Sequence, residues 1–478
     1  MIGEIFETSD AVGLAALIRS GELTAAELAE EAIRRIEAKN PRLNAIVYKA
    51  YDQARRRAAG PLPQGPLSGV PFVIKDLFTQ HEDFPVTNGS RFLDGFVGPT
   101  PSLFAERMKA AGLVALGKSN VPEMGAAPTT EPAFRGPTIN PWSERIVPGG
   151  SSGGSAVAVA SAMVPIADAS DGGGSIRIPA SVNGLVGLKP SRGRVPYGPD
   201  VVDIWYGAAV FGCVSRSVRD TAAFLDAVSG GEVGDPYRLA DPAVPYLSLL
   251  DAPAPRLTIG FVAEAPDGTP LGEEAQRAVA NAAALCRDLG HAVREKPFRY
   301  DVEGLRKAMR RVTAVLNAGF FVACARSLGK VVTEADVEPV TFALYQLGLG
   351  ITGEQHASDI AALRVMGRAI ARDLDDVDVL ISPTLPTPPK DRGWYDMSLK
   401  DVAEYDARVA TNGVFTRPFN ISGQPAVSLP LHFTADEIPF GVQFVGRIGE
   451  EATLLGLSGQ LEQAQPWMEK LRRKPFRV

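Results

Sequence analysis

Short apolar runs alternate with amphipathic helical patterns along most of this 478-residue chain. The runs have the length of buried strands, and the segments between them place apolar residues on one helix face. Strands that alternate with helices favour α/β layers around a central sheet. The expected strands cover residues 69–75, 113–117, 165–169, 257–262, 291–293, 377–381, 426–431 and 441–446. After a first helix described next, the expected helices cover residues 101–111, 156–163, 273–289, 355–374 and 451–463.

The first expected helix carries signals at both ends. Thr24 and Glu27 stand at the spacing of a capping box, in which each side chain bonds a free backbone N–H at the helix start. We expect the helix to stop at Asn40-Pro41, because the residue before a proline avoids the helical conformation. Between these ends an apolar stripe consists of Leu28, Ala32, Ile33 and Ile36.

No internal repeat, low-complexity segment or long linker interrupts the chain. Domain boundaries normally fall in exposed, flexible linkers, so their absence favours one large domain over residues 1–478. The composition, 45% hydrophobic and 22% charged, is that of a globular protein that can bury a large core.

Charge and metal-ligand spacing exclude several classes of function. The net charge is −6, and no basic face or stripe indicates a nucleic-acid partner. The cysteines and histidines are scattered, with no CxxC or HExxH spacing, so we expect no metal site. One basic cluster lies at the C-terminal end and is interpreted as a solvated terminus: Lys470, Arg472, Arg473, Lys474 and Arg477.

The sequence also predicts a cytoplasmic protein without a membrane partner. The first residues are acidic and lack the apolar stretch of a signal peptide. The longest run of small apolar residues that we identify, 156–167, is interrupted by Ser161 and Pro165 and is too short to span a bilayer.

Two glycine-serine clusters, residues 149–155 and 170–177, are the most unusual local feature. Glycine allows backbone conformations and close approaches that other residues do not. Neither cluster matches a phosphate-binding loop or a dinucleotide fingerprint. Residues 150–154 satisfy the GxSxG nucleophile-elbow pattern, but that pattern requires a histidine partner. The two clusters can also be interpreted as tight turns without a catalytic role.

A long-range pattern connects these clusters with a lysine. Lys75 lies in GVPFVIKD, Ser151 in PGGSSGGS and Ser175 in DGGGSIRIPAS. In order and spacing these three motifs resemble the amidase signature family, and the resemblance extends over most of the chain. Further segments similar to family landmarks are residues 118–120, 138–141, 187–190, 423–426 and 440–446.

The resemblance implies a fold and a division of the chain. The expected fold is a single large α/β/α layered domain, with helices flanking a central twisted mixed sheet. It would comprise an N-terminal helical segment at about 10–60, a signature core at about 65–230 and a remainder that completes the sheet and the substrate pocket.

The resemblance also assigns catalytic roles that elementary chemistry can test. Ser175 would attack an amide carbonyl, and its proton would pass through Ser151 to Lys75. A serine hydroxyl needs such a base, but a lysine with the ordinary pKa of about 10.4 is protonated at neutral pH. Burial lowers that pKa, and the apolar neighbours 72–74 make burial of Lys75 plausible.

The loop around the nucleophile is expected to stabilise the oxyanion. Gly172, Gly173 and Gly174 would present backbone N–H groups together with that of Ser175. The family often has Thr or Ile at the position of Gly172, which predicts a looser loop in this chain. The Gly150–Ser151 peptide bond is expected to be cis, as it is in the family.

Supporting and pocket residues follow from the same resemblance. Asp171 and Arg177 are expected to tie down the nucleophile loop, and Ser152 to support the relay or its loop. Substrate contacts are expected near Met124 and Gly125, opposite the nucleophile. A further contact is expected at Asn317.

These motifs together predict an amidase that cleaves a carboxamide or anilide C–N bond without a cofactor. The chain is similar to stand-alone amidases, of the aryl acylamidase and 6-aminohexanoate cyclic-dimer hydrolase type, with a homodimer left open. One alternative is a subunit of the glutaminyl-tRNA amidotransferase A type, although residues 347–356 lack that subunit's tyrosines. Another is a serine esterase of different fold that would use Ser152 and His432.

Overall fold

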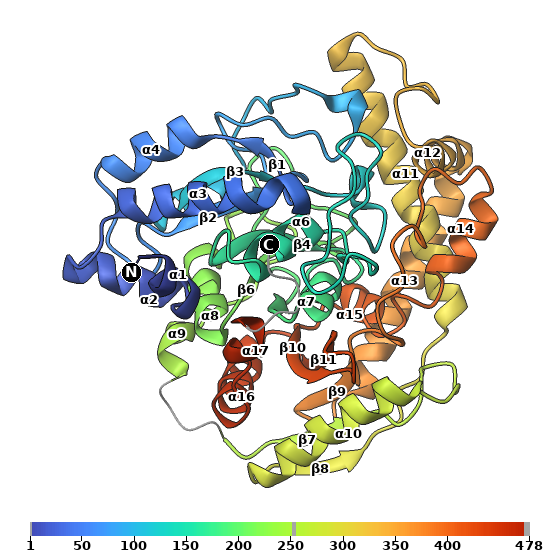
Figure 1. The fold of residues 1–478 in the computed structure, drawn as a ribbon. Helices are drawn as coiled ribbons and strands as arrows, with labels where there is room; N and C mark the ends of the chain where they lie inside the picture. The colour runs from blue at the N-terminus through green and yellow to red at the C-terminus, as the bar shows by residue number, and fades with distance from the viewer. Residues whose placement is uncertain (1, 251–254, 473–478) are drawn as a thin grey trace.

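One eleven-stranded sheet runs through the molecule and is flanked by helices (Figure 1). The structure, a computed structural model, describes residues 2–250 and 255–472, so Arg473, Lys474 and Arg477 of the expected basic tail lie outside the described residues. The strands are β1 (Ile46–Lys49), β2 (Pro71–Lys75), β3 (Val114–Ser119), β4 (Ile166–Asp171), β5 (Val186–Lys189), β6 (Val210–Ser215), β7 (Thr258–Phe261), β8 (Ala292–Glu295), β9 (Val379–Pro383), β10 (Ala426–Phe433) and β11 (Pro439–Gly446).

The sheet is mixed, as expected. Its strands lie in the order β1-β3-β2-β4-β6-β5-β10-β11-β9-β7-β8. β2 is parallel to β3 and β4, and β7 is parallel to β8 and β9, whereas the remaining neighbours are antiparallel. Each expected strand is present with shifted ends, and β1, β5 and β6 were not anticipated.

Helices pack around this sheet, and the set is larger than the sequence patterns indicated. The expected ones correspond to α3, α5, α6, α10, α13 and α16. The helices are α1 (Ile2–Thr8), α2 (Ala11–Ser20), α3 (Ala25–Leu43), α4 (Tyr51–Ala59), α5 (Leu103–Ala110), α6 (Gly153–Ala160), α7 (Arg177–Asn183), α8 (Val218–Val228), α9 (Tyr246–Leu249), α10 (Glu273–Asp288), α11 (Val302–Leu328), α12 (Pro339–Gly350), α13 (Gly353–Asp373), α14 (Val402–Val409), α15 (Arg417–Ser422), α16 (Glu451–Ala464) and α17 (Met468–Arg472).

The ends of α3 show one prediction that holds and one that is wrong. The capping box is present: Glu27 N donates to Thr24 Oγ1, and Thr24 N donates to Glu27. The helix does not stop at Asn40, however, but continues through Pro41. A proline in the last turn removes only one helical hydrogen bond. The Asn40 side chain meanwhile accepts from two backbone N–H groups beyond the helix, which fixes the turn that follows.

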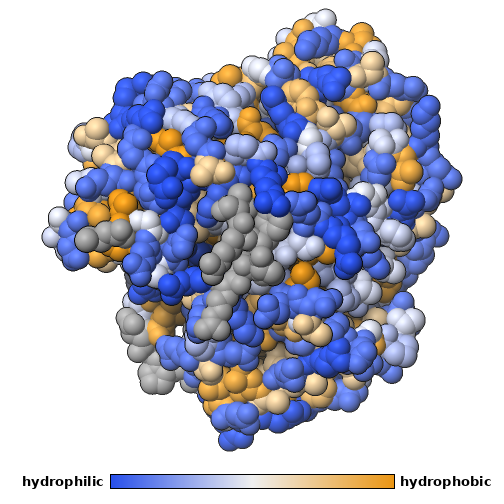
Figure 2. All heavy atoms as spheres, in the orientation of Figure 1, coloured by the Kyte–Doolittle hydropathy of each residue, from blue (hydrophilic) through white to orange (hydrophobic). Residues whose placement is uncertain are grey.

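α11 is the longest helix and was missed in the sequence. It packs against α12 and α13, and these three helices together with α14 form the side of the molecule to the right in Figure 1. By length and composition it is the one helix in the described residues that could cross a membrane, yet 44% of that window is buried inside the molecule. A helix that is covered by neighbouring helices inside a folded protein can be equally long and apolar. The face shown in Figure 2 is mainly hydrophilic, with apolar side chains in small groups.

Candidate active site

The predicted catalytic motifs meet at one edge of the sheet. β2 and β4 are parallel neighbours, so their carboxyl ends lie side by side and bring Lys75 next to Ser170. Ser151 comes from the loop that precedes α6, and its peptide bond with Gly150 is cis, as expected. The two serine loops are joined directly, because the backbone N–H of Ser152 donates to the carbonyl of Ser175 at 3.3 Å.

Lys75 is enclosed by hydroxyl and carbonyl oxygens. Its side chain is 0% exposed, and that of Ser151 is 2% exposed. Lys75 Nζ lies 2.9 Å from Ser151 Oγ, 2.9 Å from Ser170 Oγ and 3.3 Å from the Ser170 carbonyl. The lysine therefore has two acceptors on Ser170 and a third neighbour, the hydroxyl of Ser151.

Burial makes this lysine a base near neutral pH. Desolvation lowers the pKa of Lys75 to about 7, although the nearby carboxylates of Asp168 and Asp171 act in the opposite direction. Asp168 accepts from the backbone N–H of Lys75 at 3.0 Å, which ties the end of β2 to β4. Burial also raises the pKa of the Asp168 carboxyl to about 6.

Asp171 and Arg177 form a buried ion pair below the nucleophile loop. Both side chains are 0% exposed, and Arg177 Nη2 lies 2.9 Å from Asp171 Oδ1. Burial alone would raise the pKa of the Asp171 carboxyl, but Arg177 and Asn420 outweigh it and hold that pKa well below its usual range. Arg177 also donates to the Thr416 carbonyl and to Gln443, so residues far along the chain anchor this loop.

Three of the four expected oxyanion donors face no protein acceptor. Among the described residues, the N–H groups of Gly172, Gly173 and Ser175 have no hydrogen-bond partner. Gly174 does not match the expectation, because its N–H donates to Asp171 Oδ1 at 2.7 Å. Gly174 thus holds the loop in shape, at a φ of +130° that favours glycine.

The space beside Gly172 is filled by an aromatic ring. A Cβ on Gly172 would lie 2.5 Å from the ring of Trp205, so no larger side chain fits there. Trp205 follows β5 in a loop where it and Tyr206 both have left-handed backbone conformations. The tryptophan thus packs against the position where the family often has Thr or Ile.

Two cavities meet at Ser175, which is half-buried and lines both of them. The smaller, of about 30 Å³, also exposes Ser151 and has mainly apolar walls, including Phe211. The larger, of about 180 Å³, is bounded by residues of α11, α12 and α14. The predicted pocket residues lie here: Met124 lines the smaller cavity, Asn317 the larger one, and Gly125 both.

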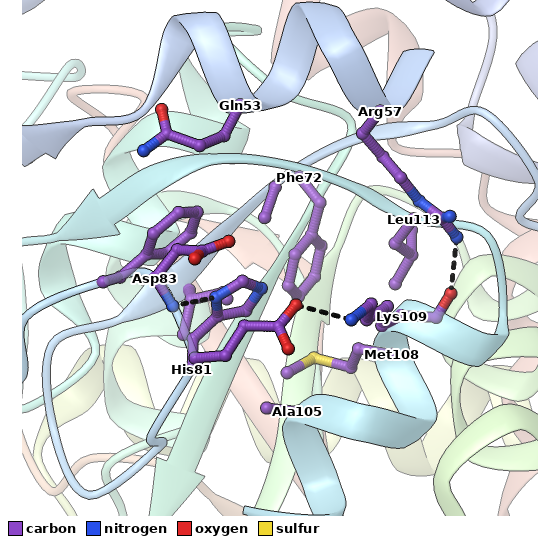
Figure 3. A pocket seen from close by; sticks show the side chains of 13 residues that line it. Gln53, Arg57, Phe72, His81, Asp83, Ala105, Met108, Lys109 and Leu113 are labelled. Carbon is purple, nitrogen blue, oxygen red and sulfur yellow. Dashed lines mark hydrogen bonds and ion pairs between the residues drawn. The ribbon is translucent and has the colours of Figure 1, made fainter. Parts of the chain in front are cut away.

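A third cavity, of about 100 Å³, contains none of the predicted site residues (Figure 3). His81 and Lys109 line it, and the His81 ring stacks on Phe84 while Glu82 pairs with Lys109. Arg57 donates to the carbonyl of Lys109 in the same wall. The cavities at Ser175 are therefore the candidate site.

No histidine is available to either serine loop. Each of the four histidines has a ring nitrogen bonded elsewhere in the described residues, and none of the four lines either cavity at Ser175. His432 bonds Glu274, and Ser152 Oγ bonds the Ser170 carbonyl. The other ring contacts are His81 with Asp83, His291 with Leu257 and Gln460, and His356 with Tyr206. The nucleophile-elbow interpretation thus lacks its base.

Several residues of the site were not found from the sequence. Ser170 was noted only as part of a cluster, although the residue type and its place before Asp171 suit an acceptor for the lysine. Trp205 and Arg417 also line the larger cavity, but Trp205 stands in a loop and Arg417 begins the short helix α15, so neither belongs to a clear periodic pattern. A pair of adjacent aromatic residues, Trp205 and Tyr206, and a lone arginine within RPFNISGQPA were the signals available.

Comparison with known proteins gives the family. A family model described as Amidase matches residues 27–455. Over 475 residues the chain is 38% identical to the 6-aminohexanoate-cyclic-dimer hydrolase of Paenarthrobacter ureafaciens, with 96% of each chain covered. The chain therefore belongs to the amidase signature family, and it is a hydrolase of amide C–N bonds.

Solved structures show the same relationship. A 6-aminohexanoate cyclic dimer hydrolase complexed with substrate matches with a TM-score of 0.91 and 36% identity, covering 97% of this chain and 98% of that one. A bacterial aryl acylamidase matches with a TM-score of 0.88 and 28% identity, covering 98% and 99%. The predicted α/β fold with a flanked mixed sheet is confirmed by these matches and by the sheet itself.

Proposed function

We propose that this chain cleaves a carboxamide or anilide through a covalent acyl-Ser175 intermediate, with Ser151 and Lys75 as its proton relay. The observation that carries the proposal is the 2.9 Å contact between Lys75 Nζ and Ser151 Oγ, two side chains that are 0% and 2% exposed. A buried lysine with a pKa of about 7 is largely neutral at pH 8 and can accept a proton.

The contacts of Lys75 orient its lone pair. A neutral amine has two N–H groups and one lone pair. Both N–H groups have acceptors on Ser170, the hydroxyl oxygen at 2.9 Å and the carbonyl at 3.3 Å. The lone pair is then directed toward the hydroxyl of Ser151, which donates to it. Ser170 is a positioning residue in this arrangement.

The proton steps balance along this line. As Ser175 Oγ attacks the amide carbonyl, its proton moves to Ser151 Oγ and the proton of Ser151 moves to Lys75. The relay then returns a proton to the departing nitrogen, the C–N bond breaks, and the acyl group remains on Ser175. Water attacks the ester by the same relay and releases the carboxylate.

Backbone donors stabilise the charge that develops on the carbonyl oxygen. The unpartnered N–H groups of Gly172, Gly173 and Ser175 suit this role, because they cost no reorganisation when the oxyanion forms. Asp171 fixes the loop on the opposite side by accepting from Gly174 and Arg177. The backbone donors that stabilise the oxyanion and the serine that attacks thus belong to one short segment.

The substrate class follows from the relatives and the cavities. The related proteins are named for a cyclic amide dimer and for aryl acylamides. The two cavities that meet at Ser175 can take the two sides of a small or mid-sized amide. We propose that such an amide is the substrate, bound without a cofactor.

A fluorophosphonate probe tests the nucleophile. We expect it to label Ser175, and Ser175→Ala to abolish both labelling and anilide turnover. Ser152→Ala is the matched control, because Ser152 lies one residue from Ser151 but bonds only the backbone of Ser170. Labelling that persists in Ser175→Ala and disappears in Ser152→Ala would refute the assignment.

The same assay distinguishes the amidotransferase alternative. The purified chain is expected to hydrolyse an anilide alone. Turnover that appears only after partner subunits are added would favour a subunit of the amidotransferase type.

A further inference from the structure

The larger cavity contains an arginine without an acidic partner. Arg417 lines this cavity, and no carboxylate of residues 2–250 or 255–472 lies within 4.0 Å of its guanidinium. Its Nη1 and Nη2 atoms only reach the carbonyls of Ala410 and Val409, each at 3.3 Å. The charge on Arg417 is therefore not neutralised by the protein around it.

The other arginines of the cavity differ in this respect. Arg306 bonds Glu303 at 2.7 Å, and Arg310 bonds Asp406 at 2.5 Å. Both of these charges are offset by a neighbouring carboxylate. Arg417 thus gives this wall of the cavity an excess positive charge, although the whole chain has a net charge of −6.

Arg417 also lies next to the oxyanion loop. A Cβ on Gly173 would lie 3.5 Å from Arg417 Cγ, so the stem of the arginine packs on that glycine. The preceding residue, Thr416, donates to the carbonyl of Gly173 at 2.6 Å. A group bound by Arg417 would accordingly sit a short distance from a carbonyl held at Ser175.

A partly buried cation without an anion is unfavourable. Burial lowers the pKa of Arg417, and the guanidinium of Arg306 lowers it further. Arginine nevertheless stays charged in proteins, because its intrinsic pKa is so high. A ligand carboxylate would replace the missing partner, and it matches the planar guanidinium in a two-point hydrogen bond.

We propose that Arg417 binds a carboxylate of the substrate, so that the preferred substrates are amides with an acid group on the part that enters the larger cavity. The inference rests on the proposed amide hydrolysis at Ser175 and adds the substrate class to it. The part of the substrate on the other side of the scissile bond then faces the small, mainly apolar cavity.

Two pairs of matched substrates test this. Glutaryl 4-nitroanilide and pentanoyl 4-nitroanilide differ in a carboxylate on the acyl side. 4-Acetamidobenzoate and 4-methylacetanilide differ in a carboxylate on the amine side. We expect the wild-type enzyme to prefer the acid in one pair by at least tenfold in kcat/KM, mainly through a lower KM.

Variants then assign the preference to one side chain. Arg417→Met is expected to remove the preference for the acid, and Arg417→Lys to keep part of it, because the charge remains and the planar fork is lost. Arg306→Met is the matched control, because it removes a positive charge from the same cavity but one that Glu303 already offsets. We expect it to retain most of the preference.

The outcomes separate this inference from the proposed function. Turnover of the neutral substrates that depends on Ser175, without a preference for the acids, would overturn the carboxylate site and leave the hydrolase intact. An equal loss for acid and neutral substrates in Arg417→Met would also overturn it, because Arg417 would then act on the oxyanion in general. Hydrolysis of all four substrates that persists in Ser175→Ala would contradict the proposed function itself.

Discussion

At the scale of single residues, chemistry in this protein depends on removing water from a lysine. Lys75 ends a strand in which all five residues are buried, and this burial lowers its pKa against the neighbouring carboxylates, which raise it. The motifs predicted which residues would react. They could not predict that Ser170 accepts from Lys75, or that the N–H of Gly174 is used by Asp171, because those contacts depend on the final path of each loop.

The pH dependence of kcat/KM follows from the lysine. The relay needs neutral Lys75, so activity should rise with pH through about 7 and level off above it, because the protonated lysine dominates below that pH. A profile from pH 5.5 to 9 measures this.

A second buried lysine serves as the control for that profile. Burial also lowers the pKa of Lys189 to about 7, but its Nζ bonds the carbonyl of Pro190 and not a reacting group. Lys189→Met should leave the midpoint near 7. A flat wild-type profile, or a midpoint that disappears in Lys189→Met, would show that Lys75 is not the titrating base.

The ion pair below the nucleophile gives a prediction about stability. Arg177→Met leaves the Asp171 carboxylate buried without its partner, which typically costs about 3–5 kcal/mol. Urea unfolding at pH 7 should show a decrease of that size. A decrease below about 1 kcal/mol would mean that Asn420 alone compensates the charge.

The contribution of the Asp171–Arg177 pair to folding stability depends on pH. The pKa of Asp171 is lower in the folded chain than its ordinary value of 3.8, so the folded state binds fewer protons than the unfolded state as pH falls past that value. Its contribution to stability is therefore fully present above about pH 4 and is lost at lower pH. In Arg177→Met, this part of the acid sensitivity should be reduced.

At the scale of elements, strands were easier to predict than helices and loops. Buried strands such as β2 and β9 appear as continuous apolar runs. α11 and α12 have weak apolar periodicity, because both line a cavity or contact helices on several sides, and they were missed. β5 and β6 were also missed, since their short, glycine-containing sequences resemble loops.

The loop that carries Trp205 allows a test of shape at this scale. Gly172→Ile should decrease kcat/KM by at least tenfold, because its side chain cannot fit beside the indole ring. Trp205→Ala alone should be less harmful, and the double variant Gly172→Ile with Trp205→Ala should recover activity relative to Gly172→Ile. Independent, additive losses in the double variant would show that the two residues do not share this space.

At the scale of the whole molecule, the site is assembled from distant parts of the chain. Lys75 belongs to β2, whereas the ion pair at Asp171 is anchored through Asn420 and Gln443. One continuous sheet connects these regions. The order of its strands could not be predicted, because the sequence patterns specify each strand but not which strands pair across hundreds of residues.

Unfolding should reflect this shared sheet. We expect one cooperative urea transition, in which activity, tryptophan fluorescence and helical circular dichroism are lost at the same midpoint. A domain over residues 1–478 is our proposal, and this measurement tests it. Two separated transitions, with activity following only one of them, would instead indicate two units.

The wall of the larger cavity has a consequence for how such enzymes diversify. Lys75 stands at the end of β2 and the two serines lie in loops beside the sheet, whereas one wall of the larger cavity belongs to α11, α12 and α14. We expect that these helices can differ between relatives while the reacting groups stay unchanged. A chimera that carries these helices from another family member should acquire that member's preference among amide substrates. It should keep the kinetic mechanism of this chain.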